Sequence, residues 1–171
     1  MPKNETSYKR YSLRKILFND YFSFLAWMFP VVIFGMSLFI EIFGFFPDLK
    51  RGRPPLGVEA IPFFIQLGVI TLIIGFIVII FRVIAIKSYF DKGVELKGKV
   101  TGIWVWRVDR GRIYFTYHYK NLEYENSMFV HFHKMTKVFL PNKQIDVLVK
   151  PSNPLKAIIK DIFTDTLYRT K

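Results

Sequence analysis

Cysteine is absent from this 171-residue chain, and the carboxylates are few and scattered. Without cysteine there is no disulfide framework, no thiolate nucleophile and no cysteine-based metal site. The sequence also lacks a G-x-S-x-G, an H-E-x-x-H, a P-loop and a dinucleotide-binding fingerprint. We therefore predict a non-enzymatic protein with no cofactor and no resident metal.

Negative charge is in short supply as well, because 25 Lys and Arg residues stand against 13 Asp and Glu, a formal net charge of +12. A basic excess is typical of proteins that contact nucleic acid or anionic lipid, and of membrane proteins with basic cytoplasmic flanks. The net charge alone leaves all three classes open.

Two long runs have no charged side chain, residues 21–40 and 61–81, and they favour the membrane protein among these three classes. About twenty residues at ~1.5 Å of helical rise each span the ~30 Å hydrocarbon layer of a bilayer. We predict an integral membrane protein whose transmembrane hairpin, at 21–86, consists of helices at about 21–43 and 61–86 joined by a Pro- and Gly-rich loop at 44–60.

The segment before the first run, residues 1–20, is a basic flank without the features of a cleaved signal peptide. Residues 12–18 in it are either solvated or a short amphipathic turn on anionic head groups. This flank and the segment after the second run carry five Lys or Arg each, and the loop carries three. The positive-inside rule then predicts a multi-pass protein of the cell (inner) membrane with both termini in the cytoplasm.

Small and polar side chains in the second run mark a candidate helix-packing face. Thr71 and Gly75 have the small-xxx-small spacing that lets helix backbones approach, Gly68 precedes them, and Gln66 is the one strongly polar side chain of the run. A lone Gln near the end of a span favours an interhelical hydrogen bond over a substrate ligand. Association of several copies through Gly68, Thr71 and Gly75 would make the protein a homo-oligomeric transport or pore subunit.

From about residue 94 the apolar residues recur with a period of two, which predicts half-buried β-strands. A two-residue turn at Arg110-Gly111 would pair Trp106 with Phe115 and put Trp104 and Trp106 on the apolar face; a second turn, at Asn121-Leu122, follows. The predicted strands are 96–108, 113–119, 124–132, 144–149 and 155–162. We predict a small all-β domain at 94–163, with about five antiparallel strands in a partly open barrel or roll around a three-stranded meander. Residues 161–171 have no partner pattern, and 164–171 form a C-terminal tail.

The order of several short motifs resembles a family of bacterial membrane-anchored proteins with a small β-domain of unknown function. These motifs are a G-x-V strand at Gly98, an aromatic hairpin around Phe115 and Tyr124, and a closing Val147-Leu148-Val149-Lys150-Pro151-Ser152-Asn153-Pro154, which is similar to the family's V-x-V-x-x-P-x-N-P. The resemblance implies a membrane anchor and a β-domain, and it implies no reaction.

Basic and aromatic side chains of the predicted hairpins define a candidate interaction surface: Arg107, Arg110, Arg112, Tyr114, Phe129, His131 and His133. The two histidines alternate along one strand, but the predicted register places arginines opposite both of them, so we expect no metal there. Small barrels bind nucleic acid with such surfaces. A domain tethered at an anionic membrane favours a lipid or a protein partner instead.

We predict that the cytoplasmic β-domain is an interaction or assembly module for another membrane component. The expected partners are the lipid bilayer and a membrane protein or a second copy of the chain. The alternatives are the homo-oligomeric pore subunit and a membrane-anchored binder of anionic lipid or nucleic acid.

Overall fold

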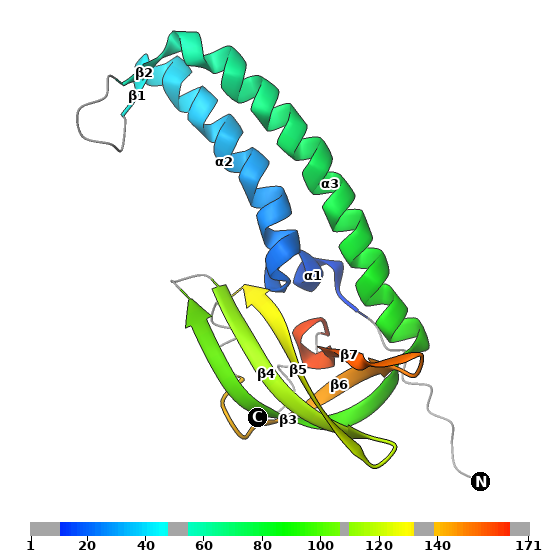
Figure 1. Ribbon diagram of the computed structural model, residues 1–171. Helices are drawn as coiled ribbons and strands as arrows, with labels where there is room; N and C mark the ends of the chain where they lie inside the picture. Colours follow the sequence, from blue (N-terminus) through cyan, green and yellow to red (C-terminus); the bar gives the residue numbers. More distant parts are fainter. Residues whose placement is uncertain (1–10, 48–54, 107–109, 132–138, 165–171) are drawn as a thin grey trace. The chain divides into compact units, whose positions relative to one another are not determined.

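The computed structural model describes residues 11–47, 55–106, 110–131 and 139–164 (Figure 1). The chain divides into two compact units. The helical unit is Phe22–Phe81, and the β-unit comprises the described parts of Met1–Tyr21 and Arg82–Lys171.

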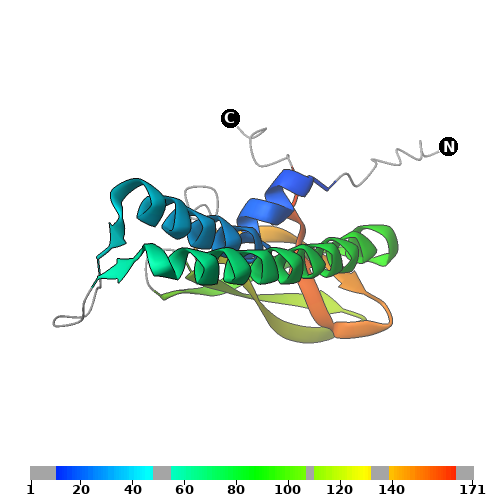
Figure 2. The same ribbon diagram turned by 90° about the horizontal axis from the view of Figure 1, so that it is seen from above.

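The helical unit consists of two antiparallel helices that lie side by side (Figures 1 and 2). Its elements are α2 (Tyr21–Phe43), β1 (Phe45–Phe46), β2 (Leu56–Gly57), the 3-10 turn η1 (Val58–Ala60) and α3 (Ile61–Lys92). α2 ends where it was predicted to end, and α3 continues to Lys92, beyond the predicted residue 86. β1 and β2 pair antiparallel across the loop, which was expected to be irregular.

Helices α2 and α3 are each long and apolar enough to cross a membrane. Only 28% of the most apolar window of α2 and 11% of that of α3 are buried within the chain, whereas the core helix of a soluble protein is mostly buried. Exposed side chains such as Phe63, Phe76 and Phe81 would be costly in water but are stable in lipid. The hairpin therefore has the length, composition and surface of a membrane anchor.

The β-unit is built on one antiparallel sheet with the strand order β5-β4-β3-β6-β7. Its elements are α1 (Leu13–Asn19), β3 (Val94–Trp106), β4 (Arg110–Tyr119), β5 (Leu122–His131), β6 (Gln144–Lys150), β7 (Asn153–Ile159) and η2 (Lys160–Ile162). The predicted meander occupies one half of the sheet rather than its centre, because β3 pairs with both β4 and β6.

The two outer strands of the sheet approach each other and nearly close it into a barrel. The Nδ2 atom of Asn126 on β5 donates a hydrogen bond to the carbonyl oxygen of Leu155 on β7 at 2.8 Å. The hydroxyl of Tyr117 donates to the carbonyl of Pro154. The predicted fold class, a helical hairpin followed by a small all-β domain of five antiparallel strands, is confirmed.

The core of the β-unit also takes in residues from outside the sheet. Ile16 of α1 and Ile86 and Phe90 of α3 are buried in it together with Phe115 and Val147. The last part of α3 therefore belongs to the β-unit. Residues 12–19 of the N-terminal segment do so too, and with Lys15, Ile16 and Asn19 buried this part is not a solvated flank.

Residues at the two ends of the described chain meet in this unit. The backbone N–H of Ser12 donates to the carbonyl oxygen of Phe163 at 2.9 Å, and Asn19 Nδ2 donates to that of Ile162 at 2.6 Å. Ile162, Phe163 and Thr164 are buried, so the prediction that no partner exists beyond residue 160 is wrong for them. Residues 165–171 lie outside the described parts.

The predicted strand registers are wrong, although the strands themselves are found. The second hairpin turns at Lys120 and Asn121, whose φ values of 51° and 63° fit a type I′ turn, and not at Asn121-Leu122. Phe115 consequently pairs with Asn126. The observed pairing of β4 with β5 is shifted by two residues from the predicted pairing, so the same side chains still face the core.

The first hairpin differs more, because Arg110 and Gly111 do not form the predicted turn but belong to β4, where Arg110 pairs with Trp106. β3 also contains a β-bulge. Val100 pairs with Phe115, but the next pair is Gly102 with Tyr114, so one additional residue of β3 lies between them. A bulge of this kind reverses which face of the sheet the following side chains occupy. Trp104 and Trp106 are therefore 48% and 46% exposed, and the prediction that they lie on the apolar inner face is wrong.

Candidate functional site

The bulge in β3 brings aromatic and basic side chains together on the outer face of β3, β4 and β5. In register, Trp106 lies beside Arg110 and Trp104 lies beside Arg112. Arg112 in turn pairs with Phe129 on β5. We call this set the arginine–aromatic face: Trp104, Trp106, Arg110, Arg112, Tyr114 and Phe129.

Arg110 lies between two aromatic rings. Its guanidinium carbon is 4.8 Å from the centroid of the Trp106 ring and 4.5 Å from that of Tyr21, the first residue of α2. Its Nη2 atom donates a hydrogen bond to the Tyr21 hydroxyl at 2.6 Å. The Nε atom is buried and has no hydrogen-bond partner in the described part of the chain. Cation–π contacts therefore hold this guanidinium against the start of α2.

Arg112 is held in the same way one row further along the sheet. Its guanidinium carbon is 4.9 Å from the Phe129 centroid and 5.2 Å from the Tyr114 centroid. The Nε atom donates to the hydroxyl of Ser127 at 2.9 Å. The ring of Trp104 is stacked on that of Trp106, with centroids 6.2 Å apart and an interplanar angle of 9°.

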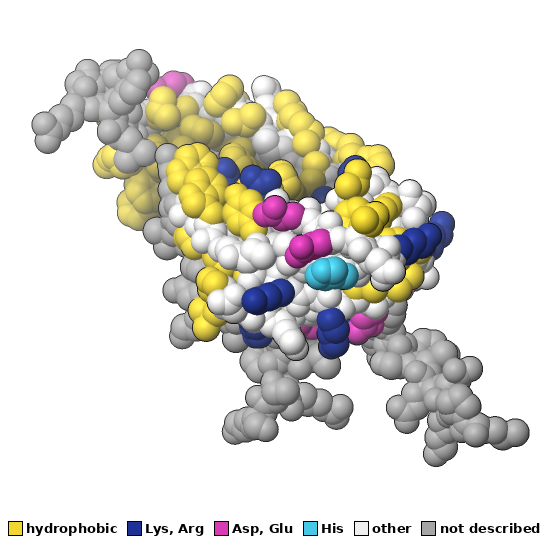
Figure 3. Space-filling model, turned by 60° about the horizontal axis from the view of Figure 1, so that its bottom comes forward, with side chains coloured by type: hydrophobic (Ala, Val, Ile, Leu, Met, Phe, Trp, Pro, Cys, Tyr) yellow, Lys and Arg dark blue, Asp and Glu magenta, His cyan; other side chains and the backbone are white. Residues whose placement is uncertain are grey.

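The electrostatics of this face are one-sided. Within the described ranges, no ion pair joins Arg110 or Arg112 to a carboxylate. Glu125, which pairs with Thr116, lies further along the same face of the sheet, and Figure 3 shows acidic side chains among the basic and hydrophobic ones on the side that it draws. Two guanidinium groups that form no ion pair within the described segments create a local positive potential that suits an anionic ligand.

The predicted interaction surface is therefore partly assembled. Arg110, Arg112, Tyr114 and Phe129 are brought together, and Arg107 and His133 fall outside the described residues. His131 pairs with Arg110, two residues away from its predicted partner, and its Nδ1 atom lies 3.0 Å from the carbonyl oxygen of Phe18. The described segments contain no group of three His, Asp or Glu residues that could hold a metal.

Sequence reasoning missed Tyr21, Trp104 and Trp106 as members of the site. A bulge leaves no mark in the alternation of residue types, so the position of the tryptophans could not be read from the sequence. Tyr21 is the first residue of a charge-free run, and its contact with a residue 89 positions away depends on the tertiary fold.

A buried ion pair lies next to this site. Asp20 is fully buried, and both of its carboxylate oxygens accept from Arg82, with Nε to Oδ2 at 3.0 Å. A signal for this pair exists in the sequence, because Asp20 precedes the first apolar run and Arg82 follows the second. In an antiparallel hairpin those two positions come to the same end.

The predicted helix-packing residues lie inside the hairpin or on its surface. A Cβ atom at Gly75 would be 2.1 Å from the carbonyl oxygen of Ala26, and one at Gly68 would be 2.7 Å from the Phe34 ring. The hydroxyl of Thr71 bonds to carbonyls of its own helix. Gly68 and Gly75 therefore pack α3 against α2 of the same chain. Gln66 is exposed.

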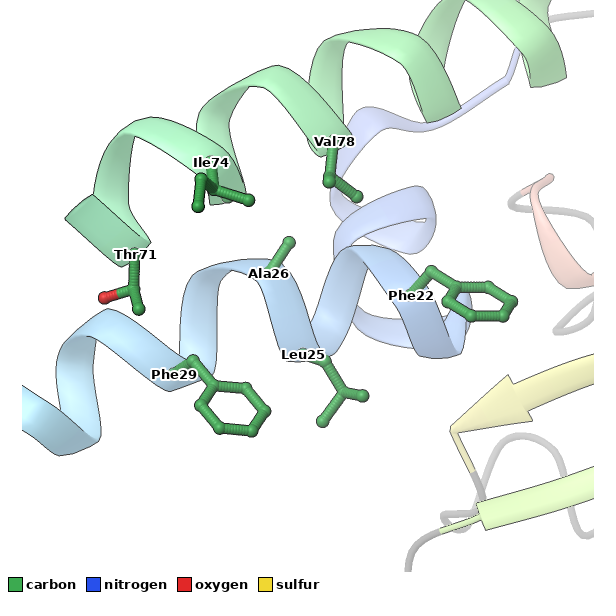
Figure 4. Close-up of a pocket in the computed structure, with 8 residues that line it drawn as sticks. Phe22, Leu25, Ala26, Phe29, Thr71, Ile74 and Val78 are labelled. Atoms are coloured by element: carbon green, nitrogen blue, oxygen red, sulfur yellow. The ribbon is translucent and has the colours of Figure 1, made fainter. Parts of the chain in front are cut away.

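Beside Gly75 the two helices leave an apolar groove of about 240 Å³ (Figure 4). Phe22, Ala26 and Phe29 line it from α2, and Thr71 and Val78 line it from α3. It is open and has almost no polar lining, so it offers no means of recognising a polar substrate.

No protein family, curated protein or solved structure matches this chain. Function must therefore be argued from the site itself.

Proposed function

We propose that the protein is a non-enzymatic, membrane-anchored interaction module of a bacterial inner membrane. The helical hairpin anchors it, both termini lie in the cytoplasm, and the β-unit binds another component of the same membrane. We further propose kinship with the bacterial membrane-anchored β-domain proteins that the motifs around Gly98 and Pro154 resemble.

The observation that carries the proposal is the arginine–aromatic face. Trp and Arg are enriched at the energetically dominant positions of interfaces, and here two of each lie on one exposed sheet face. Contact with Tyr21 keeps this face at the residue where the first candidate span begins. A component of the membrane is therefore the partner within closest reach.

The homo-oligomeric pore is less well supported. The small residues that would mediate association, Gly68 and Gly75, are occupied by contacts with α2 of the same chain. A pore built from this hairpin would need another face of α3.

Site-specific photo-crosslinking tests the proposal. A photo-reactive amino acid replaces Trp104 in the full-length protein in native membranes, and the matched control carries it at Leu155, which is 72% exposed on β7. We expect a discrete adduct with a membrane component from position 104 and none from position 155. The double variant R110Q/R112Q should lose most of that adduct. Equal labelling from both positions, or an adduct that survives R110Q/R112Q, would overturn the proposal.

A further inference from the structure

We infer that the membrane component bound by the arginine–aromatic face is the phosphate of anionic phospholipid head groups. This inference rests on the proposed function and names the ligand of the same site.

The first argument is the way in which the guanidinium groups are presented. The guanidinium carbons of Arg110 and Arg112 each lie over two aromatic rings, which leaves the N–H groups at the edges to bind ligands, apart from the buried Nε of Arg110. The hydrogen bonds found use Nη2 of Arg110 and Nε of Arg112. A guanidinium has five N–H donors, and an edge with two free donors matches two oxygens of one phosphate. Lysine could not provide this geometry.

The second argument is the level of the site relative to the bilayer. Tyr21 contacts Arg110 and is also the first residue of α2, the first candidate span. The residue at which a span begins lies at the head groups, where Trp and Tyr are enriched in membrane proteins. The guanidinium of Arg110 is thus held at the depth where lipid phosphates lie.

The third argument is the combination of charge and apolar surface. Trp104 and Trp106 expose nearly half of their surface beside two cations, and among the described residues no carboxylate pairs with those cations. A head-group layer supplies phosphate to the arginines and, just beneath it, apolar chains to the rings. RNA would supply phosphate and bases but would have to reach a face held against the start of a span.

The test uses the two tryptophans as reporters in the full-length protein. A Trp27→Phe background leaves Trp104 and Trp106 as the only tryptophans of the chain. The protein is placed in nanodiscs of phosphatidylcholine that contain a head-group spin label, with increasing fractions of phosphatidylglycerol. We expect quenching of the tryptophan fluorescence to rise with the phosphatidylglycerol fraction and to weaken in high salt.

Three variants make the result specific. R110Q/R112Q should show little rise in quenching across the whole range of phosphatidylglycerol fractions, because each basic side chain near an anionic surface contributes about fivefold to binding and the two together ~25-fold. K120Q/K156Q removes the same charge at exposed positions elsewhere and should behave like the parent protein. R112Q alone leaves the Arg110–Tyr21 bond in place, and it should give an intermediate loss even if the double variant folds poorly.

Quenching that is independent of phosphatidylglycerol, or an equal effect of K120Q/K156Q, would overturn the lipid inference. The crosslinking experiment separates this failure from failure of the proposed function. An arginine-dependent adduct of position 104 with a membrane protein or an RNA, without any phosphatidylglycerol dependence, refutes lipid as the ligand. A protein adduct of this kind leaves the interaction module intact. Absence of any adduct refutes both.

Discussion

At the scale of single residues, the Asp20–Arg82 pair is an ion pair with one fully buried partner. Asp20 is fully buried and Arg82 retains 35% side-chain exposure. Loss of the carboxylate removes the negative charge that faces a partly buried guanidinium, which costs more than loss of a surface pair. We expect Asp20→Asn to lower the free energy of unfolding by about 2 kcal/mol, below the 3–5 kcal/mol of a fully buried pair.

Lys97→Gln is the matched control for Asp20→Asn. It breaks the pair with Asp146, in which the Lys97 side chain is 80% exposed, so a loss of less than about 1 kcal/mol is expected. Denaturant unfolding of the detergent-solubilised protein measures both changes. Equal losses would show that burial gives the Asp20 pair no special weight.

Asp161 provides a pH-dependent test at the same scale. Burial, together with the nearby Asp146, raises the pKa of the Asp161 carboxyl above its ordinary value. The folded state then binds this proton more tightly than the unfolded state, so stability falls as the pH rises from the ordinary pKa through the raised one. We expect Asp161→Asn to raise the thermal midpoint at neutral pH and to leave it unchanged well below pH 4, where the parent carboxyl is protonated.

Thermal melts of the parent protein and Asp161→Asn across this pH range measure the effect. A difference that stays constant with pH would mean that the substitution acts through packing and not through ionisation.

At the scale of elements, Gly98 controls how β3 coils between its two neighbours. A Cβ atom there would be 2.8 Å from the carbonyl oxygen of Thr116 and 2.7 Å from a methyl group of Val147. Overpacking of this kind costs about 1–3 kcal/mol, so Gly98→Ala should destabilise the β-unit by about 2 kcal/mol. At Gly102 the nearest atom is 3.9 Å away, and Gly102→Ala should change stability by less than about 0.5 kcal/mol.

Denaturant unfolding of Gly98→Ala and of Gly102→Ala compares the two glycines, which lie in the same strand. If both substitutions are tolerated, the strands can separate at Gly98 without loss, and close approach is not what its position requires.

Gly75 tests the packing of the hairpin in the same manner. The carbonyl oxygen of Ala26 would lie 2.1 Å from an added Cβ, whereas Gly35 has no atom within 4 Å. We expect Gly75→Ala to lower the melting temperature in detergent, with a cost of about 1–3 kcal/mol, and Gly35→Ala to leave it unchanged or slightly raised because Ala is the better helix former. A lower melting temperature for Gly35→Ala alone would reverse this assignment of the packing face.

The positions of the long helices and of the five strands of the β-unit were largely predictable from the sequence, but the registers between the strands were not. Charge-free runs and a period of two revealed α2, α3 and all five strands within a few residues. The alternation of apolar and polar residues in the sequence is the same with or without the bulge in β3. The additional residue nevertheless moves the side chains that follow it to the opposite face of the sheet. Arg112, Phe129 and Tyr114 were grouped in one predicted surface and do lie together, but the predicted register placed His131 opposite Arg112, and it put Trp104 and Trp106 on the inner face.

At the scale of the whole molecule, the predicted orientation can be tested without background labelling because the chain has no cysteine. Single cysteines are introduced as Val58→Cys in the loop of the hairpin and Ser152→Cys in the β-unit, both at exposed positions. With both termini in the cytoplasm, a membrane-impermeant maleimide should label Val58→Cys on spheroplasts and should label Ser152→Cys only after permeabilisation. Labelling of Ser152→Cys on closed spheroplasts would reverse the orientation.

The bonds that join Ser12 and Asn19 to Phe163 and Ile162 also set an order of events during biosynthesis. The ribosome makes residues 22–81 long before Ile162, so both hydrophobic helices are available for insertion while the short N-terminal helix still lacks its partner. The barrel therefore closes last, on a chain already fixed at the bilayer. Ribosome-stalled chains that stop before Ile162 should leave α1 accessible to protease, and the released full-length chain should protect it.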